Sequence, residues 1–233
     1  MTIKRDVGAN LITYLIFIVI AIIGIWYGKS IHDAHFLRVW SFTNIWLLLI
    51  GIPFLFFQSK AGIPEFWQST IPAGKRFFLP VLIGVAFGLL DLLVFKIILH
   101  PEPYSELPPF TQPFPYSIFL YFSGAFEVEV FYRLIPFTII LLLGNWIAKG
   151  KYYKFFLIAG FILTSIREPL EQLPDGSTLL VMYSLITGFF MNLLQVVWFK
   201  KAGFLASLSI RLGHYLIWHI LLGCYIQFFE LNL

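Results

Sequence analysis

The sequence has few charged residues and a single cysteine. Asp, Glu, Lys and Arg make up 12% of its 233 residues, about half of the roughly 25% that is usual in soluble domains. Together with 59% hydrophobic residues and a mean hydropathy of +0.85, this shortage excludes a soluble globular domain. The lone Cys224 excludes a disulfide framework, a cysteine-based zinc site and a CxxC redox pair.

Long apolar runs dominate the chain instead. Seven runs bounded by charge, Pro or Gly predict membrane-spanning helices over residues 11–27, 42–58, 78–99, 116–147, 153–170, 177–199 and 203–228. Because the runs are continuously apolar, the predicted fold is an all-α transmembrane bundle. The stretches between them are short, so we predict one integral-membrane domain over 1–233. The fourth run could also be divided at Pro136 into a crossing and an interfacial helix, which would make eight spans.

The positions of the basic residues predict the orientation of the bundle. An N-terminus inside places most of the 16 Lys and Arg in cytoplasmic segments: Lys4, Arg5, Lys60, Lys75, Arg76, Lys149, Lys151, Lys154, Lys200 and Lys201. The opposite loops hold only Lys29 and Arg38. Since basic residues stay on the cytoplasmic side, we expect a cytoplasmic N-terminus. The net charge of +4 then reflects topology, and no nucleic-acid partner is expected.

Two connecting segments differ from ordinary loops. Residues 62–77 mix aromatic and basic side chains, which fits either an in-plane segment at the membrane surface or a loop packed under the bundle. Residues 100–115 contain six prolines and several aromatics. Prolines exclude a helix there, so we expect an extended but ordered cap on the outer side.

Ionisable residues inside the apolar runs are the strongest functional signal. They are Asp91, Lys96, Glu127, Glu129, Arg133, Arg167, Arg211, His214 and His219. A charge near the bilayer centre costs about 2.5–3.5 kcal/mol on insertion scales, so such side chains normally face the bundle interior and pair with each other. Their number predicts a functional site within the membrane.

Helical spacing relates these residues to one another. Glu129 and Arg133 are four residues apart and can pair, whereas Glu127 lies about 200° around the helix from Glu129. The pair is either a structural ion pair or a general base oriented by an arginine. Asp91 and Lys96 lie on one span, and Lys96 is expected to reach toward the membrane surface.

The last span carries two histidines on different faces. Arg211, His214 and Trp218 share one face by their spacing of three and four, whereas His219 is rotated by about 140° from His214. We therefore expect one of the two histidines to face the core of the bundle.

The segment EVEVFYRLIPF, followed by a Gly-rich crossing and a His-bearing last helix, resembles the CPBP family of intramembrane proteases, which includes the CAAX prenyl endopeptidases. The resemblance covers about residues 116–220. It implies an all-α bundle that cleaves peptide bonds within the membrane. The family's first motif is Glu-Glu-x-x-x-Arg, and aligning it on Arg133 places Glu129 at the second Glu and Val128 at the first, which is the water-activating base of the family.

The other two family motifs are also incomplete. The second, Phe-x-x-x-His, aligns with the segment around Pro169 to Gly176 and places Gln172 at the histidine. The third, His-x-x-x-Asn, aligns with His214 but has Trp218 where Asn is expected. The resemblance implies that Glu129 or Glu127 activates water, that Gln172 orients it, and that Arg211 or His214 stabilises the oxyanion, with Arg133 and His219 nearby.

The resemblance also implies partners and surroundings. The family is described as metal-dependent, but the two histidines and the carboxylates do not match zinc spacings such as HExxH. Cys224 follows both Arg211 and His214, an order that does not fit a cysteine nucleophile. A site between helices implies membrane lipid around it and a peptide or lipidated protein entering laterally. Size and resemblance together suggest a bacterial cytoplasmic membrane.

Three functions are consistent with these residues. The first is an intramembrane endopeptidase of CPBP type. The second is a pseudoprotease that binds a membrane partner without cleaving it, because Val128 and Gln172 replace motif residues. The third is a proton-coupled transporter in which Glu127, Glu129 and Arg211 form a relay.

Overall fold

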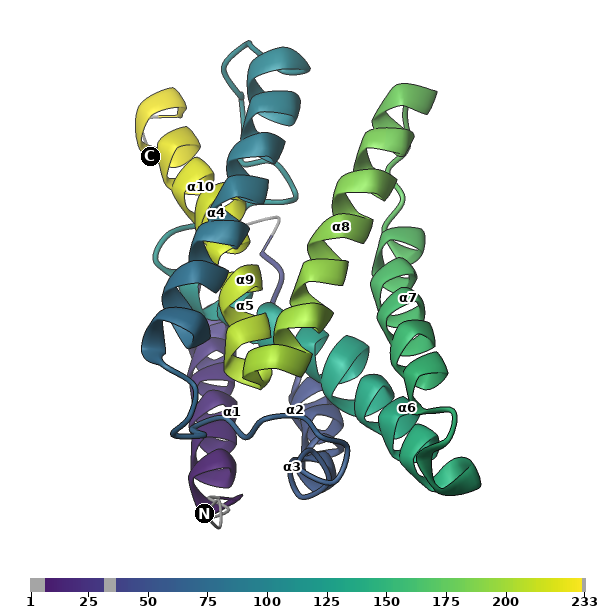
Figure 1. The fold of residues 1–233 in the computed structure, drawn as a ribbon. Helices are drawn as coiled ribbons and strands as arrows, with labels where there is room; N and C mark the ends of the chain where they lie inside the picture. The colour runs from purple at the N-terminus through teal and green to yellow at the C-terminus, as the bar shows by residue number, and fades with distance from the viewer. Residues whose placement is uncertain (1–6, 32–36, 232–233) are drawn as a thin grey trace.

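The computed structural model describes residues 7–31 and 37–231 (Figure 1). Within these ranges every regular element is a helix and no strand occurs, which confirms the all-α class. Lys4 and Arg5, which contribute to the predicted orientation, lie outside the described residues.

The helices follow the predicted apolar runs to within a few residues. The first three are α1 (Val7–Ser30), α2 (Phe42–Leu49) and α3 (Ile52–Leu55). Next come α4 (Leu79–Asp91), flanked by π-helical turns Gly74–Phe78 and Leu92–Ile98, and then α5 (Tyr116–Glu129), a π-helical turn Val130–Leu134 and α6 (Ile135–Trp146). The last are α7 (Tyr153–Glu171), α8 (Thr178–Ala202), α9 (Phe204–Tyr215), a π-helical turn Leu216–Leu221, α10 (Leu222–Tyr225) and a final turn Ile226–Glu230.

Four of the described helices are long and apolar enough to cross a membrane. They are Val7–Ser30, Gly74–Ile98, Thr178–Ala202 and Phe204–Glu230, with 24 to 27 residues each. At about 1.5 Å per residue they exceed the roughly 30 Å hydrocarbon core of a bilayer. They coincide with the first, third, sixth and seventh predicted spans, and they indicate an integral membrane protein. The apolar stretch Phe42–Leu55 is shorter.

Helical structure is not interrupted at Pro136. Helical structure continues from Tyr116 through α5 and α6 to Trp146, and Pro136 lies in the first turn of α6, directly after the π-helical turn. Proline cannot donate to the carbonyl four residues earlier and its ring crowds that carbonyl. The wider π-helical turn at Val130–Leu134 accommodates this, so the helix continues instead of breaking.

Glycines allow two helix pairs to pack closely (Figure 1). In the antiparallel pair of α1 and α5, Gly24 faces Phe119 and Gly28 faces Tyr116. Between α4 and α9 the backbones themselves meet, because Gly84 lies against the carbonyl of Ile210. In Figure 1, α4, α9 and α10 form one side of the bundle, while α7 and α8 lie beside each other on the other side.

The two unusual connections are both packed against the bundle. Phe66 is fully buried and stacks on Phe204 with ring centroids 4.8 Å apart, which favours the packed loop over the in-plane segment for this part of 62–77. Residues 100–115 contain no helix. They are ordered by contacts with the last helix, such as Phe110 stacked on Trp218 at 4.8 Å and the Phe114 N–H donating to Gln227.

Candidate functional site

Two glutamates and two arginines form a buried cluster at the centre of the bundle. Glu129 and Arg133 come from the α5–α6 helix, Glu168 from α7 and Arg211 from α9, and each side chain is at most 5% exposed. Arg133 Nη1 lies 3.0 Å from Glu129 Oε1. Arg211 binds Glu168 with two parallel hydrogen bonds of 2.6 and 2.5 Å, the bidentate geometry that guanidinium and carboxylate groups favour. We call these four residues the charge cluster.

Neutral side chains add hydrogen bonds to the charge cluster, although the Nε atoms of Arg133 and Arg211 are buried without a hydrogen-bond partner among the described residues. Ser207 donates to Glu129 Oε2 at 2.5 Å, and the Gln195 amide donates to Glu129 Oε1 at 3.1 Å. Gln195 also accepts from Arg133 at 2.7 Å, and Asn192 accepts from both Arg133 and Arg211. Both oxygens of Glu129 are therefore occupied, and the charges of the cluster balance.

A cavity of about 380 Å³ lies beside the charge cluster. Helices α4, α7, α8 and α9 contribute to its wall, together with the π-helical turn after α9. Of the charge cluster, Glu168 and Arg211 reach this wall, whereas Glu129 and Arg133 are not among the described residues that line it. We call it the central cavity.

A carboxylate–imidazole pair occupies one wall of the central cavity. His214 Nε2 lies 2.7 Å from Asp91 Oδ2, and the Tyr183 hydroxyl donates to Asp91 Oδ1 at 2.7 Å. His214 Nδ1 is buried and has no hydrogen-bond partner among residues 7–31 and 37–231. A carboxylate on one imidazole nitrogen leaves the other nitrogen available as an acceptor or a base.

Both histidines of the last helix line the central cavity, and His214, at 7% exposed, is the one of the two that is buried in the core. His219 lies 2.5 Å through Nδ1 from the Phe110 carbonyl and stacks on Tyr121 at 4.3 Å. The π-helical turn Leu216–Leu221 brings both to the cavity, because its wider repeat changes the angle between His214 and His219 from that of a regular α-helix.

The residues implied by the CPBP resemblance do not gather at one point. Glu129, Arg133 and Arg211 meet in the charge cluster, while His214, His219 and Gln172 line the central cavity. Glu127 lies elsewhere, with its carboxylate 3.5 Å from the Asn44 amide and facing a second chamber. The prediction that Glu127 and Glu129 occupy different faces of the helix is confirmed.

Sequence reasoning missed Asp91 and Glu168 as site residues. Lys96 does not pair with Asp91 but binds Glu230 at 2.8 Å. Glu168, which the spans place near a helix end, is 4% exposed and is the main partner of Arg211. One signal points to such a residue: no carboxylate lies within four residues of Arg211, so its partner has to come from another span.

The charged residues do not form a metal-ion site in the described part of the chain. No group of three or more His, Cys, Asp or Glu side chains there is placed to hold a metal ion.

Comparisons with known proteins add no identification. A scan against models of protein families found no match, and neither a search of curated proteins nor a search of solved structures found one. The fold and the buried charges define an all-helical chain with helices suited to a membrane. The CPBP resemblance depends only on the sequence segments that carry it.

Proposed function

We propose that this chain is a seven-span protein of the bacterial cytoplasmic membrane, with a cytoplasmic N-terminus, that binds a membrane-embedded peptide segment in the central cavity without cleaving it. The observation that carries this proposal is the state of Glu129. Its side chain is 0% exposed, and both of its oxygens are bonded within the charge cluster.

Glu129 is a poor general base in this setting. To activate water, a carboxylate needs a free oxygen within hydrogen-bond reach of that water. Glu129 would have to release Ser207 or Arg133 first, and breaking a buried ion pair leaves an uncompensated charge at high cost. The charge cluster therefore acts as a structural centre that joins α5, α7 and α9, and its hydrogen bonds with Asn192 and Gln195 connect it to α8.

The central cavity supplies the features of a binding site. Small or polar residues of α8, namely Ser184, Thr187 and Gly188, form one part of the lining, and Phe87 of α4 and Phe95 of the π-helical turn after α4 form another. Small residues allow a second backbone to approach a helix closely within a membrane. The Tyr183 hydroxyl bonded to Asp91 connects the two helices.

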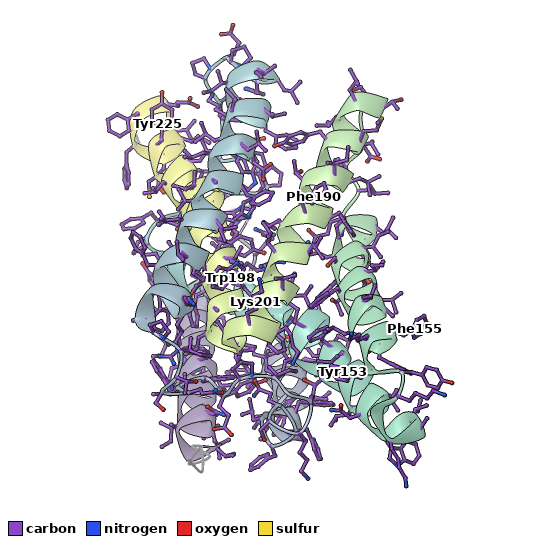
Figure 2. All side chains as sticks on the ribbon, viewed as in Figure 1. Tyr153, Phe155, Phe190, Trp198, Lys201 and Tyr225 are labelled. Carbon is purple, nitrogen blue, oxygen red and sulfur yellow. The ribbon has the colours of Figure 1, made fainter. Side chains whose placement is uncertain are left out.

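Site-specific photocrosslinking tests this proposal. A benzoylphenylalanine at Ser184 faces the central cavity, whereas one at Phe155 replaces a side chain that is 69% exposed and projects from α7 on the side away from α8 (Figure 2). We expect irradiation of membranes to yield one discrete protein adduct from position 184 and none of that mass from position 155. The captured protein should have the mass of its uncleaved, full-length chain. This mass should stay the same when His214 is replaced by Ala. The same adduct from both positions, or none from position 184, would contradict the proposal.

A second candidate function, peptide-bond hydrolysis of the CPBP type, is favoured by the Asp91–His214 pair. In this candidate His214 Nδ1, which protein atoms cover in the structure and which has to be uncovered first, takes the proton of a water molecule that attacks the scissile carbonyl and then gives it to the leaving amine. Asp91 holds the imidazole through Nε2. The base is then His214 and not Glu129. The peptide or lipidated substrate would enter the central cavity from the bilayer.

A comparison of cleavage products between membranes that contain the wild type and membranes that contain the His214→Gln or Asp91→Asn variant tests this second candidate. If hydrolysis occurs, mass spectrometry of protein N-termini in wild-type membranes should find new N-termini, created by cleavage, near apolar segments of the substrate proteins. The rate at which these ends form should fall by about 10⁴-fold with Asp91→Asn, the size of effect seen when a catalytic imidazole loses its orienting carboxylate, and by at least as much with His214→Gln, which removes the base. Identical sets of N-termini in wild-type and variant membranes would exclude hydrolysis by this pair.

A further inference from the structure

A second chamber, of about 440 Å³, adjoins the central cavity. The segment before α2 contributes Arg38 and Trp40, and the last helix contributes Tyr215 and His219, which also line the central cavity. One face of α5 lines the chamber through Tyr121, Gly124 and Glu127, which follow one another at intervals of three residues. The rest of the lining is Leu120, Phe110 and Gln172. We call this space the Arg38 chamber.

The Arg38 chamber holds one cation and one anion that do not pair. Arg38 donates through Nη2 to the Tyr121 hydroxyl at 2.9 Å, and Glu127 accepts one long contact of 3.5 Å from Asn44. Within the described ranges neither Arg38 nor Glu127 takes part in a salt bridge. This contrasts with the charge cluster, where every arginine has a carboxylate partner.

Open space separates the two charges. A Cβ atom added at Gly124 would meet nothing within 4 Å, so the wall of α5 between Tyr121 and Glu127 is bare. The six residues from Tyr121 to Glu127 correspond to about 9 Å along the helix axis. Arg38, bonded to Tyr121, therefore marks one end of the gap, and Glu127 marks the other.

We infer that the Arg38 chamber binds a small zwitterion, whose anionic group pairs with Arg38 and whose ammonium group pairs with Glu127. An ammonium and an anionic group a few bonds apart, with an ion-pair contact of about 3 Å at each end, cover about the axial spacing between Tyr121, which holds Arg38, and Glu127. A carboxylate or a phosphate suits the planar fork of Arg38. Trp40 and Tyr215 also line the chamber, and aromatic rings can attract an ammonium group or pack against an apolar substituent.

Two sources supply this chemistry: a free amino acid and the phosphoethanolamine headgroup of a lipid. The probes are L-phenylalanine and O-phosphoethanolamine, titrated calorimetrically into the full-length protein in maltoside micelles free of phosphatidylethanolamine. We expect one of them to bind, and the one that binds identifies the source. The single-charge analogues 2-phenylethylamine and 3-phenylpropionate should bind at least tenfold more weakly.

Two substitutions of different kinds locate the binding. Gly124→Leu fills the gap without changing a charge, and Glu127→Gln removes the anion while keeping the shape of the side chain. Each should weaken binding of the zwitterionic probe by at least tenfold without lowering the thermal transition. The matched controls are Gly74→Leu, at another glycine whose Cβ would meet nothing within 4 Å, and Glu106→Gln, an exposed acid of the proline-rich segment.

Three results would overturn the inference: no binding of either zwitterion to the wild type, equal binding of the single-charge analogues, or full binding by both Gly124→Leu and Glu127→Gln. If Gly124→Leu does not fold, Glu127→Gln alone decides. The photocrosslink at Ser184 reports on the central cavity, so its outcome is independent of these titrations.

Discussion

Replacement of Arg133 by leucine is expected to lower the free energy of unfolding by about 3–5 kcal/mol, the usual cost of removing one partner from a buried ion pair. Glu129 would keep the hydrogen bonds from Ser207 and Gln195 but lose its closest cation, because Arg211 Nε is 3.7 Å away. The measurement is unfolding in mixed micelles by increasing fractions of dodecyl sulfate. Arg167→Leu is the matched control, since the Arg167–Glu171 pair is nearly half exposed, and it should cost about 0–1 kcal/mol.

The double variant Glu129→Leu, Arg133→Leu separates charge from packing. Removing both partners leaves no unpaired charge between them, and the Arg211–Glu168 pair is still complete. We therefore expect the double variant to be more stable than Arg133→Leu alone, because a buried ion pair can often be replaced by apolar residues at little cost. Equal destabilisation by Arg133→Leu and Arg167→Leu would show that the charge cluster does not stabilise the bundle. A double variant less stable than Arg133→Leu would show that the cost of Arg133→Leu does not come from the charge left unpaired on Glu129.

The positions of the helices could be predicted from the sequence because their causes are local. A run of apolar residues bounded by charge or proline specifies one helix without reference to the rest of the chain, and the last predicted span, 203–228, compares with Phe204–Glu230 in the structure. The pair of Glu129 and Arg133 was predictable for the same reason, since four residues on one helix are close in space.

Contacts between helices could not be predicted in this way. His214 and Asp91 are 123 residues apart, and Arg211 and Glu168 are 43 apart, so no periodicity relates them. The angular position of His219 depends on a π-helical turn, which a rule of 100° per residue does not contain. A motif resemblance likewise assigns Glu129 a role without showing that its oxygens are already bonded.

One contact between helices does have a sequence signature that the hydropathy pattern obscures. Gly84 and Gly88 are four residues apart within an apolar run, the small-xxx-small spacing that lets two membrane helices approach closely. In the structure this face of α4 meets α9. A Cβ atom at Gly84 would lie 1.9 Å from the Ile210 carbonyl oxygen and 2.7 Å from the backbone nitrogen of His214. A Cβ atom at Gly213 would lie 2.3 Å from the Val81 carbonyl oxygen.

Gly84→Ala is therefore expected to push α4 away from α9. The atoms that block the new methyl group belong to the backbone and cannot rotate aside, so we expect at least the upper part of the about 1–3 kcal/mol range for an overpacked core. Asp91 lies on α4 and His214 on α9, so their 2.7 Å contact should be lost as well. A fall in the unfolding transition, together with weaker crosslinking from Ser184, would show both effects in one variant.

Gly124→Ala is the matched control for Gly84→Ala, because both glycines lie within helices and only the space around them differs. A methyl group at Gly124 meets nothing within 4 Å, so the substitution should instead stabilise the helix by about 0.5–1 kcal/mol, the difference in helix propensity between glycine and alanine. Opposite signs from the same chemical change would establish that the α4–α9 contact is made by backbone and depends on the missing side chain. Two changes of the same sign and size would mean that α4 and α9 do not touch at Gly84.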